Sequence, residues 1–130
     1  ICSVASGKKS HLSIFGKDYD THDGTPVRDY IHIRDLISGH ISAIDWLNSS
    51  KKNFSSINLG TGSGYSVLEI VNVFNSFLDK PIQYEYSPRR SGDPGEVFAD
   101  NSLAKSELNW SCAQSLEKMC KDSWLWHSKD

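Results

Sequence analysis

The stretch D-G-T-P-V-R-D-Y-I-H-I-R-D-L, from Asp23 to Leu36, predicts a turn, a strand and the start of a helix. Its first two residues favour a turn, and Pro26 fixes the backbone φ angle just after it. Residues 30–33 alternate and are aromatic or β-branched, which favours a strand. A helical pattern follows from about Asp35. This stretch therefore predicts that both strands and helices occur in the fold.

One arginine in this stretch is unusually placed. Arg28 lies where the turn passes into the strand. A planar, permanently charged guanidinium on such a rigid support suits a phosphate group. The alternative is a surface ion pair with Asp29 or Asp35, which is the more frequent situation for a charged residue.

Length and composition describe an ordinary globular domain of 130 residues, 38% hydrophobic, with a net charge of −2. This charge gives no indication of nucleic acid or a membrane as partner, and no apolar run has membrane-spanning length. The three cysteines form no C-x-x-C pair, which argues against a zinc site or a disulfide framework. An odd, low cysteine count favours a reducing compartment such as the cytoplasm. The chain does not begin with Met, so we expect a fragment.

Periodicity predicts the other elements. We expect helices over residues 35–48, 67–78, 102–108 and 115–127, and extended segments over residues 12–15, 54–59, 82–86 and 97–99. Ser66 and Glu69 form the pattern of a capping box. The helix after Ser66 is apolar around most of its circumference, so it should be buried on more than one side. His40 lies on an apolar helical stripe, and we expect it in the core rather than on a metal.

A glycine-rich turn, Gly60-x-Gly62-x-Gly64, precedes the 67–78 helix and imitates a dinucleotide-binding fingerprint. Its spacing lacks the third glycine three residues after the second, and no acidic residue follows at the expected distance. A tight turn beside a binding cleft is therefore the favoured interpretation. Binding of a dinucleotide phosphate at this turn is the alternative.

A second candidate for anion binding is the loop from Pro88 to Gly95. Its adjacent arginines, Arg89 and Arg90, can clamp a diphosphate, and Asp93 can accept hydrogen bonds from ribose hydroxyls. A solvated charged loop is an equally weighted alternative.

The sequence offers no reaction centre. The Tyr-x-x-x-Lys pair of short-chain dehydrogenases is absent, and the nearest patterns, Tyr30-x-x-x-Arg34 and Tyr86-x-x-x-Arg90, carry an arginine that cannot replace the lysine. Motifs of serine hydrolases, zinc proteases and P-loop proteins are also absent. These residues predict anion binding without catalysis.

Six motifs in order along the chain resemble the UDP-glucose 4-epimerase family of extended short-chain dehydrogenases/reductases. They are L-S-I-F-G-K-D-Y (12–19), D-G-T-P-V-R-D-Y-I-H-I (23–33), N-L-G-T-G (58–62), P-R-R-S-G-D (88–93), A-K-S-E-L-N-W (104–110) and W-L-W (124–126). The resemblance implies that residues 1–130 form the C-terminal UDP-sugar-binding domain, an α/β substrate-binding lobe of small sheets with packed helices. It also implies that an N-terminal Rossmann domain, with the NAD site and the catalytic Tyr and Lys, is missing.

The resemblance assigns roles to individual residues. It implies that Arg28 and Arg90 contact the diphosphate, that Tyr30 lies beside it, and that Asp93 binds the ribose. These roles place the strongest interactions on the UDP moiety and leave the hexose loosely held.

Four further positions complete the expected substrate site. By resemblance, the strand from Ser13 to Phe15 meets the uracil through backbone groups and the Phe15 ring, and Val67 lines the nucleotide site. Val97 stands where bacterial members usually carry a tyrosine against the sugar. Because valine is smaller, we predict that the full-length enzyme also accepts UDP-N-acetylhexosamines.

The implied activity is an isomerase of galactose metabolism that interconverts UDP-glucose and UDP-galactose through an NAD-dependent 4-keto intermediate. We expect the full-length protein to be a cytoplasmic homodimer without a metal site. Residues 1–130 alone should be inactive and should expose an apolar surface that promotes association. Alternatives are another UDP-sugar epimerase, acting on a UDP-pentose or UDP-glucuronate, and a non-catalytic sugar-nucleotide-binding module.

Overall fold

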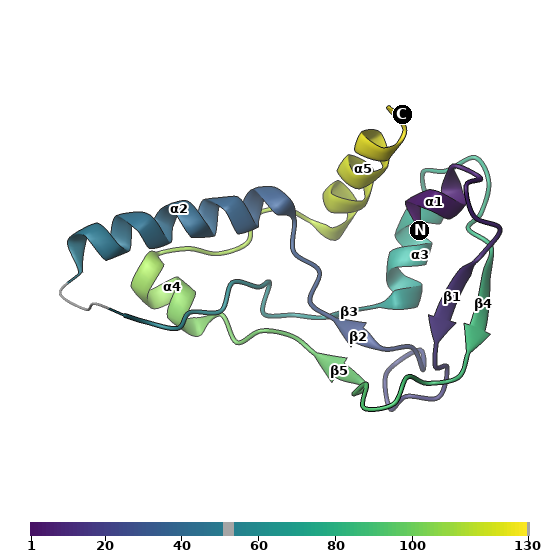
Figure 1. Cartoon of the computed structure of the whole chain (residues 1–130), viewed down its shortest axis with the longest axis horizontal. Helices are drawn as coiled ribbons and strands as arrows, with labels where there is room; N and C mark the ends of the chain where they lie inside the picture. Colours follow the sequence, from purple (N-terminus) through teal and green to yellow (C-terminus); the bar gives the residue numbers. More distant parts are fainter. Residues whose placement is uncertain (51–53, 130) are drawn as a thin grey trace.

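The structure is a computed structural model that describes residues 1–50 and 54–129. Its helices are α1 (Cys2–Ala5), α2 (Ile33–Ser49), α3 (Val67–Asn75), α4 (Ser102–Leu108) and α5 (Leu116–His127). Its strands are β1 (Leu12–Phe15), β2 (Val27–Arg28), β3 (Tyr65–Ser66), β4 (Tyr84–Ser87) and β5 (Glu96–Val97). The molecule is elongated, with α2 and α4 forming one end and α1, α3, β1 and β4 the other (Figure 1). The predicted α/β class with small sheets and packed helices is confirmed.

Two small sheets carry the strands. β1 and β4 are parallel, with Phe15 opposite Ser87 at their ends. β2 is the centre of the other sheet, antiparallel to β3 and parallel to β5. In this register Arg28 lies between Tyr65 and Val97. The arginine is thus held by neighbouring strands on both sides.

Buried hydrophobic residues form two clusters in the described part of the chain. One joins α3 and α5 and contains Ile70, Val71, Phe74, Ile82 and Cys120. The other joins α4 to α2 and contains Ala104, Leu108 and Trp110. The β2-centred sheet lies between the two ends of the molecule (Figure 1). This sheet therefore has a hydrophobic core on each side.

The predicted strand over residues 30–33 is wrong, because α2 already begins at Ile33. His32 is its N-cap: its Nδ1 accepts from the Arg34 N–H at 3.0 Å. Since Nδ1 accepts, Nε2 carries the proton and donates to Asp122 of α5 at 3.1 Å. Imidazole is an uncommon cap, so the sequence pattern did not reveal this helix start.

Other boundaries differ as well. No strand forms over residues 54–59, and the last two predicted extended segments are shifted to β4 and β5. α3 is shorter than predicted and ends at Asn75, whereas its capping box is confirmed, with the Glu69 N–H donating to the Ser66 hydroxyl at 3.0 Å. The predicted burial of α3 is confirmed too, because Asn72 is its one exposed residue.

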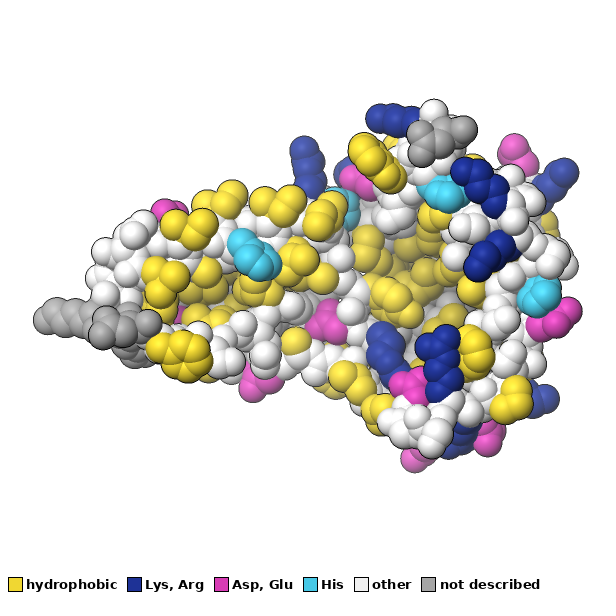
Figure 2. Space-filling model, in the orientation of Figure 1, with side chains coloured by type: hydrophobic (Ala, Val, Ile, Leu, Met, Phe, Trp, Pro, Cys, Tyr) yellow, Lys and Arg dark blue, Asp and Glu magenta, His cyan; other side chains and the backbone are white. Residues whose placement is uncertain are grey.

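The predicted core position of His40 is wrong. The side chain is exposed, and its Nδ1 donates to the Leu36 carbonyl oxygen at 2.8 Å. The stripe on which it lies faces outward. Five apolar residues of α2 are 52–62% exposed, namely Ile33, Ile37, Ile41, Ile44 and Leu47. They form a row of hydrophobic side chains along α2 (Figure 2), which we call the α2 face.

All three thiols are free, and burial raises the pKa of both Cys112 and Cys120 to about 11. Because the thiolate is the reactive form, both thiols should react with maleimide at pH 8 at least about tenfold more slowly than a small free thiol. Timed labelling followed by mass spectrometry of peptides measures these rates. Labelling at the rate of a free thiol would show that the two side chains are not buried as described.

Candidate functional site

A cavity of about 330 Å³ opens where β1, β2 and the loop after β4 meet. Seven of the eight predicted site residues line it: Ser13, Phe15, Arg28, Tyr30, Val67, Arg90 and Asp93. Val97 does not. It lies on β5 directly opposite Arg28 and is 50% exposed. Residues from four separate parts of the sequence are thus brought together around one space.

Arg28 is anchored by the loop that follows β4. Its Nη1 donates to the Val27 carbonyl oxygen at 2.7 Å, and its Nη2 donates to the Pro94 carbonyl oxygen at 2.9 Å and to the Asp93 carboxylate. The predicted alternatives, ion pairs with Asp29 or Asp35, are therefore wrong. The pair with Asp93 fixes the guanidinium at the wall of the cavity and leaves the second carboxylate oxygen of Asp93 available.

Arg90 reaches the same cavity from the other side. Its guanidinium carbon lies 3.9 Å from the centroid of the Phe15 ring, a cation–π contact. Arg28 and Arg90, which are 62 positions apart in the sequence, therefore present two permanent positive charges to one small space. Arg90 can offer its planar fork of donors to a diphosphate. Both terminal nitrogens of Arg28 already donate to protein acceptors, so Arg28 contributes its positive charge at the cavity wall.

Tyr30 completes the polar wall. Burial raises the pKa of its hydroxyl, and the nearby charge of Arg28 partly opposes that rise. The hydroxyl therefore stays protonated at neutral pH and can donate a hydrogen bond to an anion. The aromatic ring of Phe15 offers a flat apolar face suited to a nucleobase.

The glycine-rich turn is filled by a carboxylate of the protein itself. Asp29 accepts from the Thr61 N–H at 3.0 Å, from the Thr61 hydroxyl at 2.6 Å and from the Ala99 N–H at 3.1 Å. A Cβ atom at Gly60 would lie 2.4 Å from an Asp29 oxygen, so glycine is required for this approach. The turn therefore does not fit the phosphates of a dinucleotide such as NAD. It ties the end of β2 to the chain after β5.

Replacement of Asp29 by alanine should lower the free energy of unfolding by about 2–3 kcal/mol, because it leaves two backbone N–H groups and a hydroxyl without their charged acceptor. Chemical denaturation measures this loss. Asp45→Ala, on the exposed surface of α2, is the matched control and should change stability by less than about 0.5 kcal/mol. Equal stabilities of the two variants would contradict the assigned role of Asp29.

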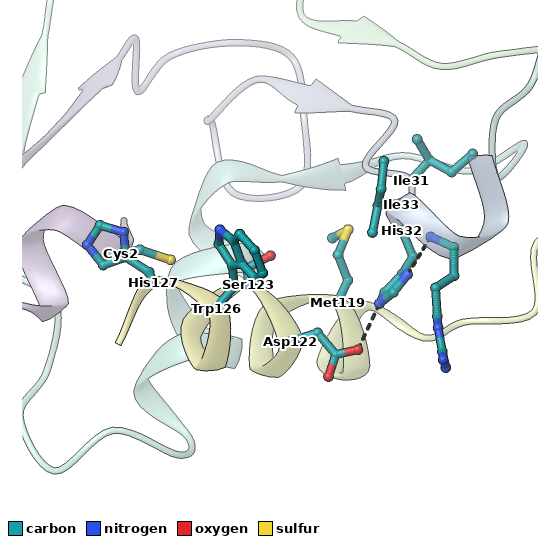
Figure 3. A pocket seen from close by; sticks show the side chains of 10 residues that line it. Cys2, Ile31, His32, Ile33, Met119, Asp122, Ser123, Trp126 and His127 are labelled. Carbon is teal, nitrogen blue, oxygen red and sulfur yellow. Dashed lines mark hydrogen bonds and ion pairs between the residues drawn. The ribbon is translucent and has the colours of Figure 1, made fainter. Parts of the chain in front are cut away.

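A larger cavity of about 700 Å³ lies between the start of α2 and α5 (Figure 3). Its walls are largely apolar and include Ile33, Met119 and Trp126, and its polar pair, His32 and Asp122, is joined by a hydrogen bond. None of the predicted site residues lines it. This largely apolar lining is typical of a packing surface and does not suit an anion.

Neither a metal nor a membrane site emerges from the rest of the described structure. Residues 1–50 and 54–129 contain no group of three or more His, Cys, Asp or Glu side chains that could hold a metal ion. Among the same residues, no helix has both the length and the apolar character needed to span a membrane. The 330 Å³ cavity is therefore the leading site in the part of the chain that the structure describes.

Comparison with curated proteins gives strong matches over the whole chain. It is 51% identical over 130 residues to a UDP-glucose 4-epimerase of Pasteurella multocida and 49% identical over 131 residues to that of Bacillus subtilis. In both cases the match covers all of this chain and 38% of the relative. No protein-family profile matches. The chain thus spans less than two fifths of the length of these relatives.

Solved structures agree with the sequence matches. The UDP-glucose 4-epimerase of Stenotrophomonas maltophila, with bound NAD and formylated UDP-arabinopyranose, superposes with a TM-score of 0.95 at 43% identity. That of Bifidobacterium longum, in complex with NAD+ and UDP, gives 0.91 at 42% identity. Both matches cover 99% of this chain and 38% of the solved chain. By sequence and by fold, the chain is therefore a relative of the UDP-glucose 4-epimerases and matches one part of their length.

Proposed function

We propose that this chain is the UDP-binding part of a longer NAD-dependent UDP-glucose 4-epimerase, an isomerase that interconverts UDP-glucose and UDP-galactose. The convergence of Arg28 and Arg90 on one cavity, beside an aromatic ring and a tyrosine hydroxyl, is the observation that carries this proposal. The similar structure from Bifidobacterium longum was solved with UDP, which supports the same ligand here.

Each group in the cavity has a task toward UDP. Arg28 and Arg90 hold the diphosphate, and Tyr30 donates a hydrogen bond to it. Asp93 keeps one oxygen on Arg28 and accepts a ribose hydroxyl with the other. The backbone of the segment from Ser13 meets the uracil. Because UDP is bound firmly by these groups, the hexose can rotate within the active site.

The base site overlaps a contact of the free protein. Arg90 covers the face of the Phe15 ring at 3.9 Å, so the uracil reaches this ring as Arg90 moves toward the diphosphate. The guanidinium then exchanges a cation–π contact for charge-assisted hydrogen bonds, which are stronger. Val67, at the start of α3, closes the apolar side of the site.

NAD, when bound, accepts the hydride from the sugar and returns it. The described residues do not fit NAD, because Asp29 occupies the glycine-rich turn. We therefore place the cofactor, together with the catalytic Tyr and Lys, on an N-terminal Rossmann domain outside this chain. The α2 face is where residues 1–130, as the C-terminal domain, would meet it.

We expect the α2 face, and not α3, to contact the missing domain. The buried sides of α3 pack within this chain, whereas α2 is the helix with an uncovered apolar row (Figure 2). The full-length protein would be a cytoplasmic homodimer. The free thiols fit a reducing compartment.

Calorimetry of this chain and of the full-length protein, with UDP and with NAD, tests the proposal. UDP should bind to both, whereas NAD should bind only at full length. Conversion of UDP-glucose to UDP-galactose should require the full-length protein. NAD binding to this chain without UDP binding would point instead to the glycine-rich turn, and UDP binding without conversion at full length would indicate a non-catalytic binding module.

Another UDP-sugar epimerase is the second candidate. The UDP-glucuronic acid 4-epimerase of Bacillus cereus has the same fold over 98% of this chain, with a TM-score of 0.80 at 27% identity. The higher identity and TM-score of the UDP-glucose enzymes favour the first proposal. Parallel assays on UDP-glucose and UDP-glucuronate separate the two candidates.

Val97 predicts a broader sugar specificity. Its small side chain lies next to Arg28 across the sheet and is half exposed, which leaves room for an N-acetyl group on the sugar. The full-length protein should therefore turn over UDP-N-acetylglucosamine, and Val97→Tyr should reduce this activity more than tenfold while activity on UDP-glucose persists. No turnover of UDP-N-acetylglucosamine, together with good activity on UDP-glucose, would contradict the prediction.

A further inference from the structure

The adjacent arginines after β4 lie on opposite sides of the chain. Arg90 lines the 330 Å³ cavity and covers the Phe15 ring. Arg89 lines a different cavity, and its guanidinium carbon lies 4.1 Å from the centroid of the Tyr19 ring. The two cations therefore cannot share one diphosphate in this arrangement.

Arg89 is held by the loop that follows β1. Its Nε donates to the Asp18 carboxylate at 2.8 Å, and its Nη2 donates to the Asp18 carbonyl oxygen. This pair lowers the pKa of the Asp18 carboxyl. A Cβ atom at Gly16 would lie 3.0 Å from Cγ of Arg89 and 2.4 Å from the Tyr19 ring. The arginine stem and the ring thus pack closely over a glycine.

These contacts join the two loops that carry the nucleotide site. Gly16 follows Phe15 directly, and its N–H donates to the Ser87 carbonyl oxygen at 2.9 Å. Arg89 immediately precedes Arg90. We call the contacts of Arg89 with Gly16, Asp18 and Tyr19 the clamp. The clamp is adjacent in sequence to the cation–π contact between Phe15 and Arg90, because Gly16 follows Phe15 and Arg89 precedes Arg90.

We infer that Arg89 is a positioning residue of the UDP site. It fixes the loop after β4 to the loop after β1 and so sets where Arg90 and Phe15 meet the nucleotide. This inference rests on the proposed function. It assigns different tasks to two arginines that the sequence alone suggested as a joint clamp for the diphosphate.

Binding of UDP and of uridine to Arg89→Ala tests the inference in the full-length protein. Both Kd values should rise, that of UDP by about fivefold and that of uridine by less, because the loss of an exposed ion pair and a cation–π contact displaces the loop and with it the positions of Arg90 and Phe15. KM for the UDP-sugar should rise with kcat unchanged. Asp18→Asn should give a smaller rise of about twofold, and the double variant should match Arg89→Ala.

The outcomes are distinguishable. Arg34→Ala removes an equal charge on α2 and should bind like the unmodified protein. A rise in Kd for UDP alone, with uridine unaffected, would show that Arg89 does not set the position of Phe15 and would overturn the inference. Unchanged binding by Arg89→Ala would also overturn it. Failure of the unmodified protein to bind UDP would overturn the proposed function itself, and the inference with it.

Discussion

UDP affinity should fall between about tenfold and hundredfold when Arg90 is replaced by alanine, because each charge-assisted hydrogen bond to a phosphate contributes about 1.5–3 kcal/mol. In the free protein Arg90 lies over the Phe15 ring, on an exposed loop, so its removal leaves the two hydrophobic cores untouched. Calorimetry with UDP measures the loss. The affinity should also decrease with salt in the unmodified protein, and less steeply in the variant.

Replacement of Arg28 should lower UDP affinity at least as much as replacement of Arg90. It should also disturb the structure more. The side chain donates to two backbone carbonyls and to Asp93, so Arg28→Ala also loosens the loop after β4. Arg28→Lys keeps the charge but loses the planar fork, and we expect it to recover only part of the affinity.

Two controls sharpen this experiment. Arg34→Ala removes a cation outside the 330 Å³ cavity and should leave UDP binding unchanged. Uridine, which carries no phosphate, should bind Arg90→Ala nearly as well as the unmodified protein. If Arg90→Ala bound UDP with unchanged affinity, the two guanidinium groups would not form a diphosphate site, and the proposed function would lose its main support.

Part of the fold is local in sequence and was therefore predictable. The capping box of Ser66 and Glu69 depends on side chains within three residues of the backbone groups they satisfy, and it is found. The strand over residues 12–15 ends at Gly16, whose φ of +95° favours glycine.

The remaining features depend on contacts between distant segments, which local patterns do not contain. His32 caps α2 while it donates to Asp122, 90 positions away. Arg28 pairs with Asp93 and not with its sequence neighbours. The separation of Arg89 from Arg90 depends on Asp18, 71 positions before Arg89. In each case a tertiary partner decides between alternatives that the local sequence leaves open.

The α2 face should promote self-association of this chain and should be required for the activity of the full-length protein. Its five apolar residues lie at successive helical turns, which makes a continuous stripe of the kind that normally packs on another layer. Exposed stripes of this kind promote association, so this chain should self-associate in solution. The double variant Ile37→Glu with Ile41→Lys should abolish that association, because the new pair is charged and favourably spaced on the helix.

The same double variant should inactivate the full-length protein. There the stripe would be buried against the N-terminal domain, and the two charges would lose their hydration in that interface, which their mutual attraction would not offset. Leu103→Lys, on the exposed side of α4, is the matched control and should leave both association and activity unchanged. Sedimentation of this chain and turnover of UDP-glucose at full length are the measurements. Full activity of the double variant would mean that the α2 face is not the domain contact, and its apolar stripe would then have to be covered by another surface.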